Sequence, residues 1–211
     1  MAFYQKEFKE AISRLPSKEK DKLILRLLKR DIPLANRLLF ELVDTQSVED
    51  RRKIVVERIR TSIGRITEQF YRISYLNMDV RYLSGEISEH VSTTKDKYGE
   101  VSLNILLLTE VLRQNRENIL TARPPIKLYK FCVAVVARVF KILLLINKMD
   151  EDLFLDFRDD LVILGRLLVN NDKIMNAAIK NGLDINWLLL PEIPDDIIVI
   201  HKELRSNGLL K

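Results

Sequence analysis

The chain has 211 residues and a mass of 24.7 kDa, the size of one ordinary domain or two small ones. Hydrophobic residues make up 47% of it and charged residues 31%, a composition typical of folded globular proteins, which argues against wholesale disorder. With only 6 Gly and 6 Pro residues the chain has few helix breakers, so its composition predicts long helices.

The charge is distributed unevenly along the chain. The net charge is +5, which divides into +6 for residues 1–72, +4 for residues 73–149 and −5 for residues 150–211. A basic front and an acidic final third allow two kinds of contact: an anionic partner for the front, or head-to-tail association of two copies.

Three features indicate a cytoplasmic protein without a membrane partner. Cys132 is the single cysteine and lies in an apolar run, so we expect a buried thiol in a reducing compartment. The first ten residues carry charges where the apolar core of a secretory signal would begin, so no signal is predicted. The most apolar segment, residues 131–146, is too short to span a bilayer and contains Arg138 and Lys141.

The first third of the chain predicts three short helices and one long one. Apolar residues recur at helical spacing in residues 3–15, 18–29 and 33–43, and we expect these helices to form one unit. Ser47 and Asp50 resemble a capping box, so a helix of about thirty residues should start at Val48. Its apolar positions form a heptad seam: Val56, Ile59, Ile63, Ile66, Phe70 and Ile73. The seam predicts packing inside one chain or, alternatively, between two copies.

The remainder predicts further helices. We expect breaks at residues 77–79 and at Pro124-Pro125, a central apolar helix over residues 126–147, and shorter helices over 153–169, 172–180 and 194–205. Residues 92–99 are compatible with either a loop or a hydrated helix. The fold class is therefore all-α, a bundle of nine or ten helices around the central apolar helix and without a sheet. We expect one domain over residues 1–211, with a possible subdivision into residues 1–122 and 124–211.

One group of carboxylates suggests a metal site. Asp152, Asp156 and Asp159 follow one another at steps of four and three, which would place them on one face of a helix. Glu86 and Glu89 are the favoured source of a second acidic helix, and Glu192, Asp195 and Asp196 are the other. Carboxylates from the two helices could together hold Mg²⁺. This alternative predicts an enzyme similar to the all-α nucleoside triphosphate pyrophosphohydrolases, although the acidic spacing departs from that family's Glu-Glu-x-x-Glu pattern. Carboxylates in a first helical turn also favour the helix dipole without any metal.

An arginine stripe suggests an anion-binding face. Arg51, Arg58, Arg65 and Arg72 are seven residues apart, on the side of the predicted long helix away from its seam. Guanidinium groups suit carboxylates and phosphates, so the stripe could bind an acidic protein surface or a nucleic-acid backbone, although charged outer faces are also normal in bundle helices. Few side chains that read or stack on bases accompany it, which favours the protein partner.

The sequence carries no motif that predicts a reaction. It contains no Walker loop, dinucleotide fingerprint or hydrolase elbow, and we interpret His90 and His201 as single surface residues. We therefore favour a non-enzymatic protein-interaction or scaffold module with a basic helical face, able to associate with itself. The Mg²⁺-dependent hydrolase and the nucleic-acid-binding protein are the two alternatives.

Overall fold

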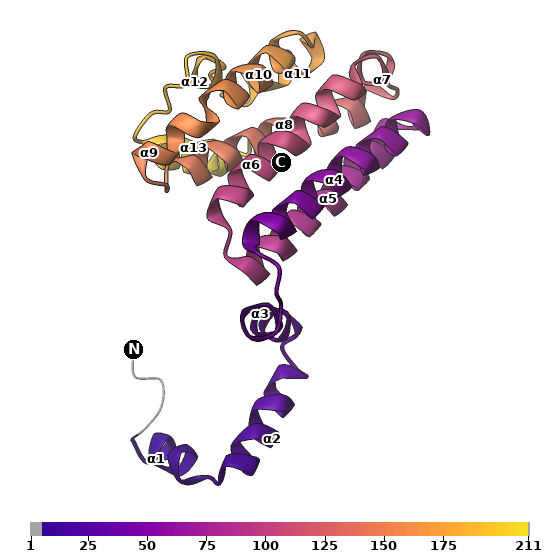
Figure 1. Ribbon diagram of the computed structural model, residues 1–211. Coiled ribbons are helices and arrows are strands. Elements are labelled where there is room, and N and C mark those ends of the chain that lie inside the picture. The colour runs from indigo at the N-terminus through magenta and orange to yellow at the C-terminus, as the bar shows by residue number, and fades with distance from the viewer. Residues whose placement is uncertain (1–5, 211) are drawn as a thin grey trace. The chain divides into compact units, whose positions relative to one another are not determined.

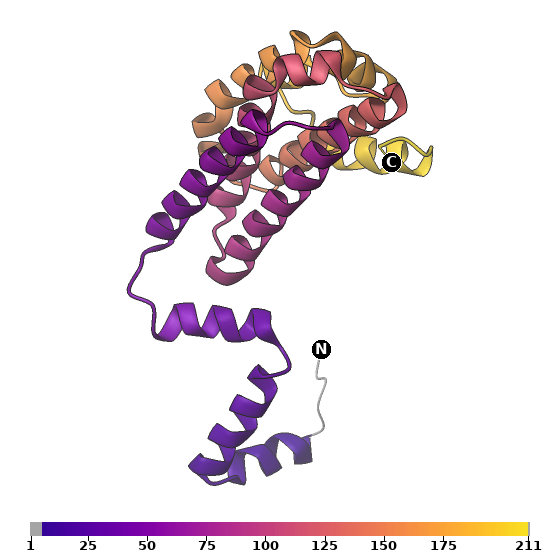
Figure 2. The same cartoon turned by 90° about the vertical axis from the view of Figure 1, so that its right-hand side faces the viewer.

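The computed structural model describes residues 6–210, apart from the side chain of Glu151. It confirms the all-α prediction: the described residues form helices and no strands, and ten helices have seven or more residues. Figures 1 and 2 show these helices from two directions. Within the described residues, no helix combines the length and the apolar character that crossing a membrane requires.

The chain divides into two compact units. Unit 1 comprises Met1–Gln46 and Ser92–Thr94, and unit 2 comprises Ser47–Val91 and Lys95–Lys211. Residues on both sides of the predicted boundary near Arg123 belong to unit 2.

Unit 1 contains the three predicted short helices. They are α1 (Lys6–Arg14), α2 (Ser17–Leu28) and α3 (Ile32–Leu42), and α2 contacts α3. Asp31 caps α3 by accepting a hydrogen bond from the Leu34 amide. No residue of these three helices is buried. Large apolar side chains therefore remain exposed: Phe8, Ile24, Leu25, Leu27, Ile32, Leu39 and Leu42.

Unit 2 begins with α4 (Val48–Glu68), which starts as predicted. The Ser47 side chain accepts a hydrogen bond from the Asp50 amide, and the Asp50 carboxylate accepts one from the Ser47 amide. The helix ends at Glu68, so the prediction of a helix of about thirty residues was wrong. The chain turns at residues 69–72, which contain neither Gly nor Pro, and the half-buried Phe70 packs against the core there.

The heptad seam lies within the core of a single chain. Ile59, Ile63 and Ile73 are buried, while Val56, Ile66 and Phe70 are half-buried and pack against the core. Tertiary packing therefore overrides the length that the heptad pattern predicts, because the last seam position belongs to the following helix.

The next two helices meet at a tight break. Helix α5 (Ile73–Thr94) continues through the predicted break at residues 77–79, which was a wrong expectation. Lys95 then adopts a left-handed conformation with φ of 61°, and Asp96 caps α6 (Lys97–Gln114) by accepting a hydrogen bond from the Gly99 amide. The polar segment 92–99 is therefore mostly helical.

Two apolar helices form the centre of unit 2. Helix α8 (Pro125–Ile146) packs on α6 and also contacts α11 (Asp172–Lys180) and α13 (Ile197–Ser206). Helix α6 contacts α4, α8 and α10 (Arg158–Val169). The core includes Phe131, Phe140 and Phe157, all almost fully buried. This arrangement confirms the prediction of a bundle around the apolar helix of residues 126–147. Shorter elements complete the unit: α7 (Arg116–Thr121), α9 (Glu151–Phe154), η1 (Leu155–Phe157) and α12 (Asn186–Leu189).

Candidate functional site

The four arginines of the predicted stripe lie on two elements. Arg51, Arg58 and Arg65 belong to α4, whereas Arg72 is the residue that precedes α5 and has an extended backbone, with φ of −151° and ψ of 148°. The end of α4 at Glu68 therefore interrupts the stripe before its fourth member.

The four arginines of the stripe also differ in how accessible they are to a binding partner. Arg51 is half-buried, and the Nη1 atom of Arg58 lies 3.7 Å from the Oε2 atom of Glu86 on α5. Arg65 and Arg72 are exposed, and no described carboxylate lies within ion-pair distance of either. The two arginines at the α4–α5 corner are thus the members of the stripe that can meet a partner directly.

These two arginines line a groove, which we call the corner groove. It has a volume of about 360 Å³ and is lined by Arg65, Ile66, Gln69, Phe70, Tyr71, Arg72, Tyr75, Leu76, Met78 and Asp79. It lies where α4 ends and α5 begins.

Exposed tyrosines give the corner groove its second chemical feature. The side chains of Tyr71 and Tyr75 are 68% and 51% exposed, and their ring centroids are 6.0 Å apart. The guanidinium carbon of Arg72 lies 4.8 Å from the centroid of the Tyr71 ring, and its Nη2 donates a 3.3 Å hydrogen bond to the Tyr71 hydroxyl. Met78 is 43% exposed one helical turn further along α5. This contact holds the Arg72 guanidinium against the Tyr71 ring.

One acidic residue moderates the charge of the corner groove. Asp79 lies in its lining, and burial raises the pKa of this carboxyl group, while the nearby charge of Arg65 partly opposes that effect. With Asp79 ionised, the lining carries two positive charges and one negative charge. The groove can therefore combine a carboxylate contact with the burial of an apolar side chain.

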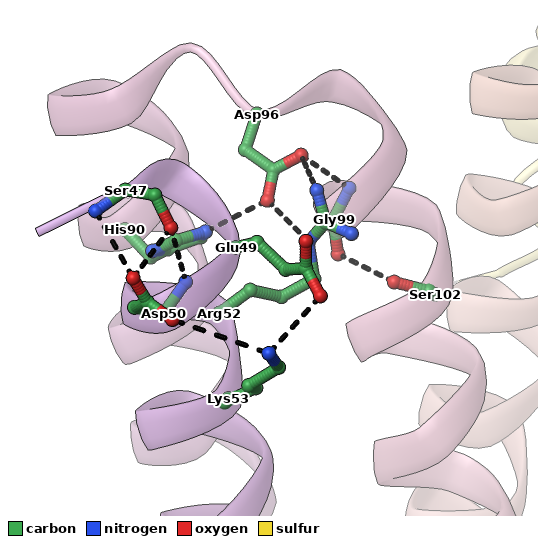
Figure 3. Close-up of polar contacts among 9 residues, drawn as sticks. All are labelled: Ser47, Glu49, Asp50, Arg52, Lys53, His90, Asp96, Gly99 and Ser102. Carbon is green, nitrogen blue, oxygen red and sulfur yellow. Dashed lines mark hydrogen bonds and ion pairs between the residues drawn. The ribbon is translucent and has the colours of Figure 1, made fainter.

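A second polar cluster, which we call the Asp96 cluster, lies at the opposite end of α4 (Figure 3). Arg52 on α4 donates hydrogen bonds of 2.6 and 2.8 Å to the two carboxylate oxygens of Asp96. The Nε2 atom of His90 lies 3.0 Å from Oδ2, and the Gly99 amide donates a 2.7 Å bond to Oδ1. His90 is therefore buried and hydrogen-bonded, and the interpretation of His90 as a surface residue was wrong.

The electrostatics of the Asp96 cluster indicate a structural role. Burial alone would raise the pKa of Asp96, but the hydrogen bonds from His90, Arg52 and Gly99 outweigh it and lower the pKa to about 2. Asp96 is therefore ionised near neutral pH, and each of its oxygens has at least two hydrogen-bond partners. A carboxylate so occupied is not available as a proton acceptor for a substrate, and it joins α4, α5 and α6 instead.

The predicted carboxylate site is not assembled as a metal centre. Asp152, Asp156 and Asp159 lie on three successive elements, α9, η1 and α10, and all three are exposed. Glu86 pairs with Arg58, and Glu89 lies on the exposed surface of α5. Among the described residues, no group of three or more His, Cys, Asp or Glu side chains could hold a metal ion.

Reasoning from the sequence missed most of the corner groove and all of the Asp96 cluster. Tyr75, Met78 and Tyr82 recur on α5 at steps of three and four, and Tyr71 lies four residues before Tyr75. This spacing could have revealed an exposed face that is rich in tyrosine. Nothing local could have joined Arg52 to Asp96, because 44 positions of chain separate them.

Comparisons with known proteins add no constraint on function. No protein-family model, curated protein or solved structure matches this chain.

Proposed function

We propose that this protein is a non-enzymatic protein-interaction module whose corner groove binds an acidic segment of a second copy of the same chain. The observation that carries the proposal is the combination of Arg65 and Arg72 with the exposed Tyr71, Tyr75 and Met78. Tyrosine, arginine and methionine are enriched at protein interfaces, where aromatic and guanidinium groups contribute much of the binding energy.

The chain itself offers a complementary surface, which we call the acidic segment. It comprises residues 150–160, which run through α9 and η1 into α10. Asp152, Asp156 and Asp159 are exposed there, and the apolar side chains of Leu153 and Leu155 are 37% and 60% exposed. Carboxylates beside exposed leucines match a groove that presents guanidinium groups beside tyrosine rings. Contact between the groove of one copy and the acidic segment of the next is heterologous, so it would extend to a ring or an open chain.

The geometry favours a protein partner over a nucleic acid. A nucleic-acid backbone needs a continuous row of cations, but Arg58 is paired with Glu86 and Asp79 lies within the groove. The tyrosines could stack on bases, yet Asp79 in its charged form would repel the phosphates beside them.

Sedimentation velocity of the full chain over a hundredfold range of concentration tests the proposal. The weight-average sedimentation coefficient should rise with concentration, and the paired substitutions Arg65→Glu and Arg72→Glu should hold the protein as a monomer. Asp152→Lys with Asp156→Lys should do the same. An equimolar mixture of the two double variants should associate again, because each supplies the surface that complements the other.

A matched control separates the specific contact from net charge. We call the protein with Arg65→Glu and Arg72→Glu the groove variant. A control protein with Lys127→Glu and Lys202→Glu has the same change in net charge, at exposed positions outside the corner groove. Self-association through these surfaces would be refuted by any of three outcomes. The wild-type protein could be monomeric, the control could dissociate as much as the groove variant, or the mixture of the two double variants could stay monomeric. Binding of a single-stranded RNA of about 20 nucleotides at about 0.15 M salt, abolished by the groove variant, would instead support the nucleic-acid alternative.

A further inference from the structure

A second hollow in unit 2 is lined by cations and, among the described residues, by no carboxylate. It lies between α5 and α8, beside the C-terminal end of the chain, and has a volume of about 540 Å³. We call it the basic pocket, and its polar lining consists of Asn77 and Arg81 from α5 and Lys130, Arg138 and Lys141 from α8. Leu210 contributes an apolar wall.

The geometry of the two helices explains why these side chains converge. Lys130, Ala134, Ala137 and Lys141 follow one another at steps of four, three and four, so they share one face of α8. The two alanines leave space at the centre of this face, and the lysines lie about 16 Å apart along the helix axis on either side. Asn77 and Arg81 lie one turn apart on the flank of α5 opposite to the one that forms the corner groove.

Arg138 is the central cation of the basic pocket. It is half-buried, its Nε donates a 3.2 Å hydrogen bond to the Ser84 hydroxyl, and its Nη1 donates a 3.3 Å bond to the Ala134 carbonyl. No described carboxylate lies within ion-pair distance of this guanidinium. A guanidinium has five N–H donors, so several remain for a ligand.

The local electrostatics favour the binding of an anion in the basic pocket. Burial lowers the pKa of Arg138, and the positive charge of Arg81 lowers it further. Lys141 is 3.4 Å from the Glu100 carboxylate, which compensates one charge, whereas no described carboxylate lies within ion-pair distance of Arg81 or Lys130. Three positive charges thus surround one hollow, and a bound anion would relieve their mutual repulsion.

Asn77 is the one uncharged polar side chain among the described residues that line the basic pocket. The Oδ1 atom of its amide is buried and has no hydrogen-bond partner among the described residues. The positive charge of the pocket therefore comes from the arginines and lysines.

We propose that the basic pocket binds a small phosphorylated anion that carries at least two negative charges, such as a pyrophosphate or a nucleoside diphosphate. The guanidinium groups of the two arginines and the ammonium groups of the lysines can donate hydrogen bonds to phosphate oxygens. The volume of the basic pocket lies in the range of small-molecule sites. The lining is concave and confined to two helices and a chain end, which favours a small molecule over a polymer. The site is separate from the corner groove and does not depend on self-association.

Isothermal titration of the full chain with sodium pyrophosphate, at about 50 mM salt and without divalent metal, tests the proposal. Wild-type protein should bind one equivalent, and Arg81→Gln should bind at least tenfold more weakly. Arg138→Gln should show the same loss, and the exposed Arg81 keeps the test decisive if that variant does not fold. Lys202→Gln on α13 removes an exposed positive charge elsewhere and should bind within about twofold of wild type.

Three results would overturn the site: no binding by the wild type, unchanged binding by Arg81→Gln, or an equal loss in Lys202→Gln. Vesicles distinguish a free phosphate from a lipid headgroup. Phosphatidylcholine vesicles that contain phosphatidylinositol bisphosphate should not sediment more of the protein than plain phosphatidylcholine vesicles do. If the protein does not bind pyrophosphate but sediments with the phosphatidylinositol bisphosphate vesicles in a way that depends on Arg81, the small-molecule site is refuted.

Discussion

Arg52 holds Asp96 through its Nε and Nη2 atoms, which donate to Oδ2 and Oδ1 of a carboxylate 44 residues further along the chain. The same guanidinium carbon lies 4.9 Å from the centroid of the Tyr98 ring, and that ring packs on Phe157 with centroids 4.9 Å apart. One arginine on α4 therefore connects the cap of α6 to an aromatic pair in the core. The side chain of Asp96 is only 3% exposed, so this contact is shielded from solvent.

Removing the charge of Asp96 should destabilise the protein strongly. In Asp96→Asn the partly buried Arg52 guanidinium loses its buried carboxylate partner, and breaking such a pair typically costs about 3 kcal/mol or more. Urea unfolding followed by circular dichroism measures the free energy of unfolding. Glu57→Gln is the matched control, because Glu57 pairs with Arg60 on the exposed face of α4 and the loss should stay below about 0.5 kcal/mol. Equal losses in both variants would contradict the structural role of Asp96.

Stability should fall in acid in a way that depends on Asp96. Its pKa is about 2 in the folded protein and lower than in the unfolded chain, so the unfolded state takes up a proton first as the pH falls. The ionised Asp96 therefore contributes about 2 kcal/mol to the free energy of unfolding. This contribution is fully present above about pH 4 and is lost as the pH falls from about 4 towards 2. Urea midpoints at a series of pH values should show a smaller acid dependence for Asp96→Asn. The prediction fails if wild type and variant lose stability in parallel.

Two glycines in neighbouring helices should respond oppositely to alanine. A Cβ atom at Gly99 would lie 2.5 Å from the carboxyl carbon of Asp96 and 3.0 Å from Nε of Arg52, so the helix cap and the ion pair would have to separate. Gly99→Ala should therefore cost about 2 kcal/mol or more. A Cβ atom at Gly85 in α5 would meet nothing within 4 Å, so Gly85→Ala should stabilise the protein by about 0.5–1 kcal/mol. Thermal unfolding of both variants tests the contrast, and a stabilised Gly99→Ala protein would refute the packing at the cap.

The sequence predicted the parts of the fold that local chemistry determines. The Ser47–Asp50 capping box and the apolar run of α8 are local patterns, and the structure has both. The break at Glu68 was missed because no Gly or Pro marks it: the chain turns there so that Phe70 and Ile73 can both reach the core. Residues 77–79, in which Asn77 and Asp79 are polar, predicted a break, yet they continue α5, since Leu76 and Val80 beside them are buried.

The two candidate sites depend on contacts that no local pattern contains. The corner groove exists because the chain turns between Arg65 and Arg72, and a continuous helix would have kept both on one straight stripe. Arg138 stood out in the sequence only as an interruption of an apolar run. Its significance depends on Arg81 and Asn77, which α5 brings to the same hollow from more than fifty positions earlier in the chain.

The thiol of Cys132 should be inert in the folded protein. Its side chain is 0% exposed in the centre of α8, and burial raises its pKa to about 12, so at pH 8 only about one thiol in ten thousand would be ionised. Because the thiolate is the reactive form, Ellman's reagent should label no thiol in native buffer and one per chain in about 6 M guanidinium chloride. A Cys132→Ala protein that also carries Ser206→Cys on exposed α13 should react at once without denaturant, which shows that the reagent is competent. Rapid labelling of the native wild-type protein would mean that α8 does not lie at the centre of a closed core.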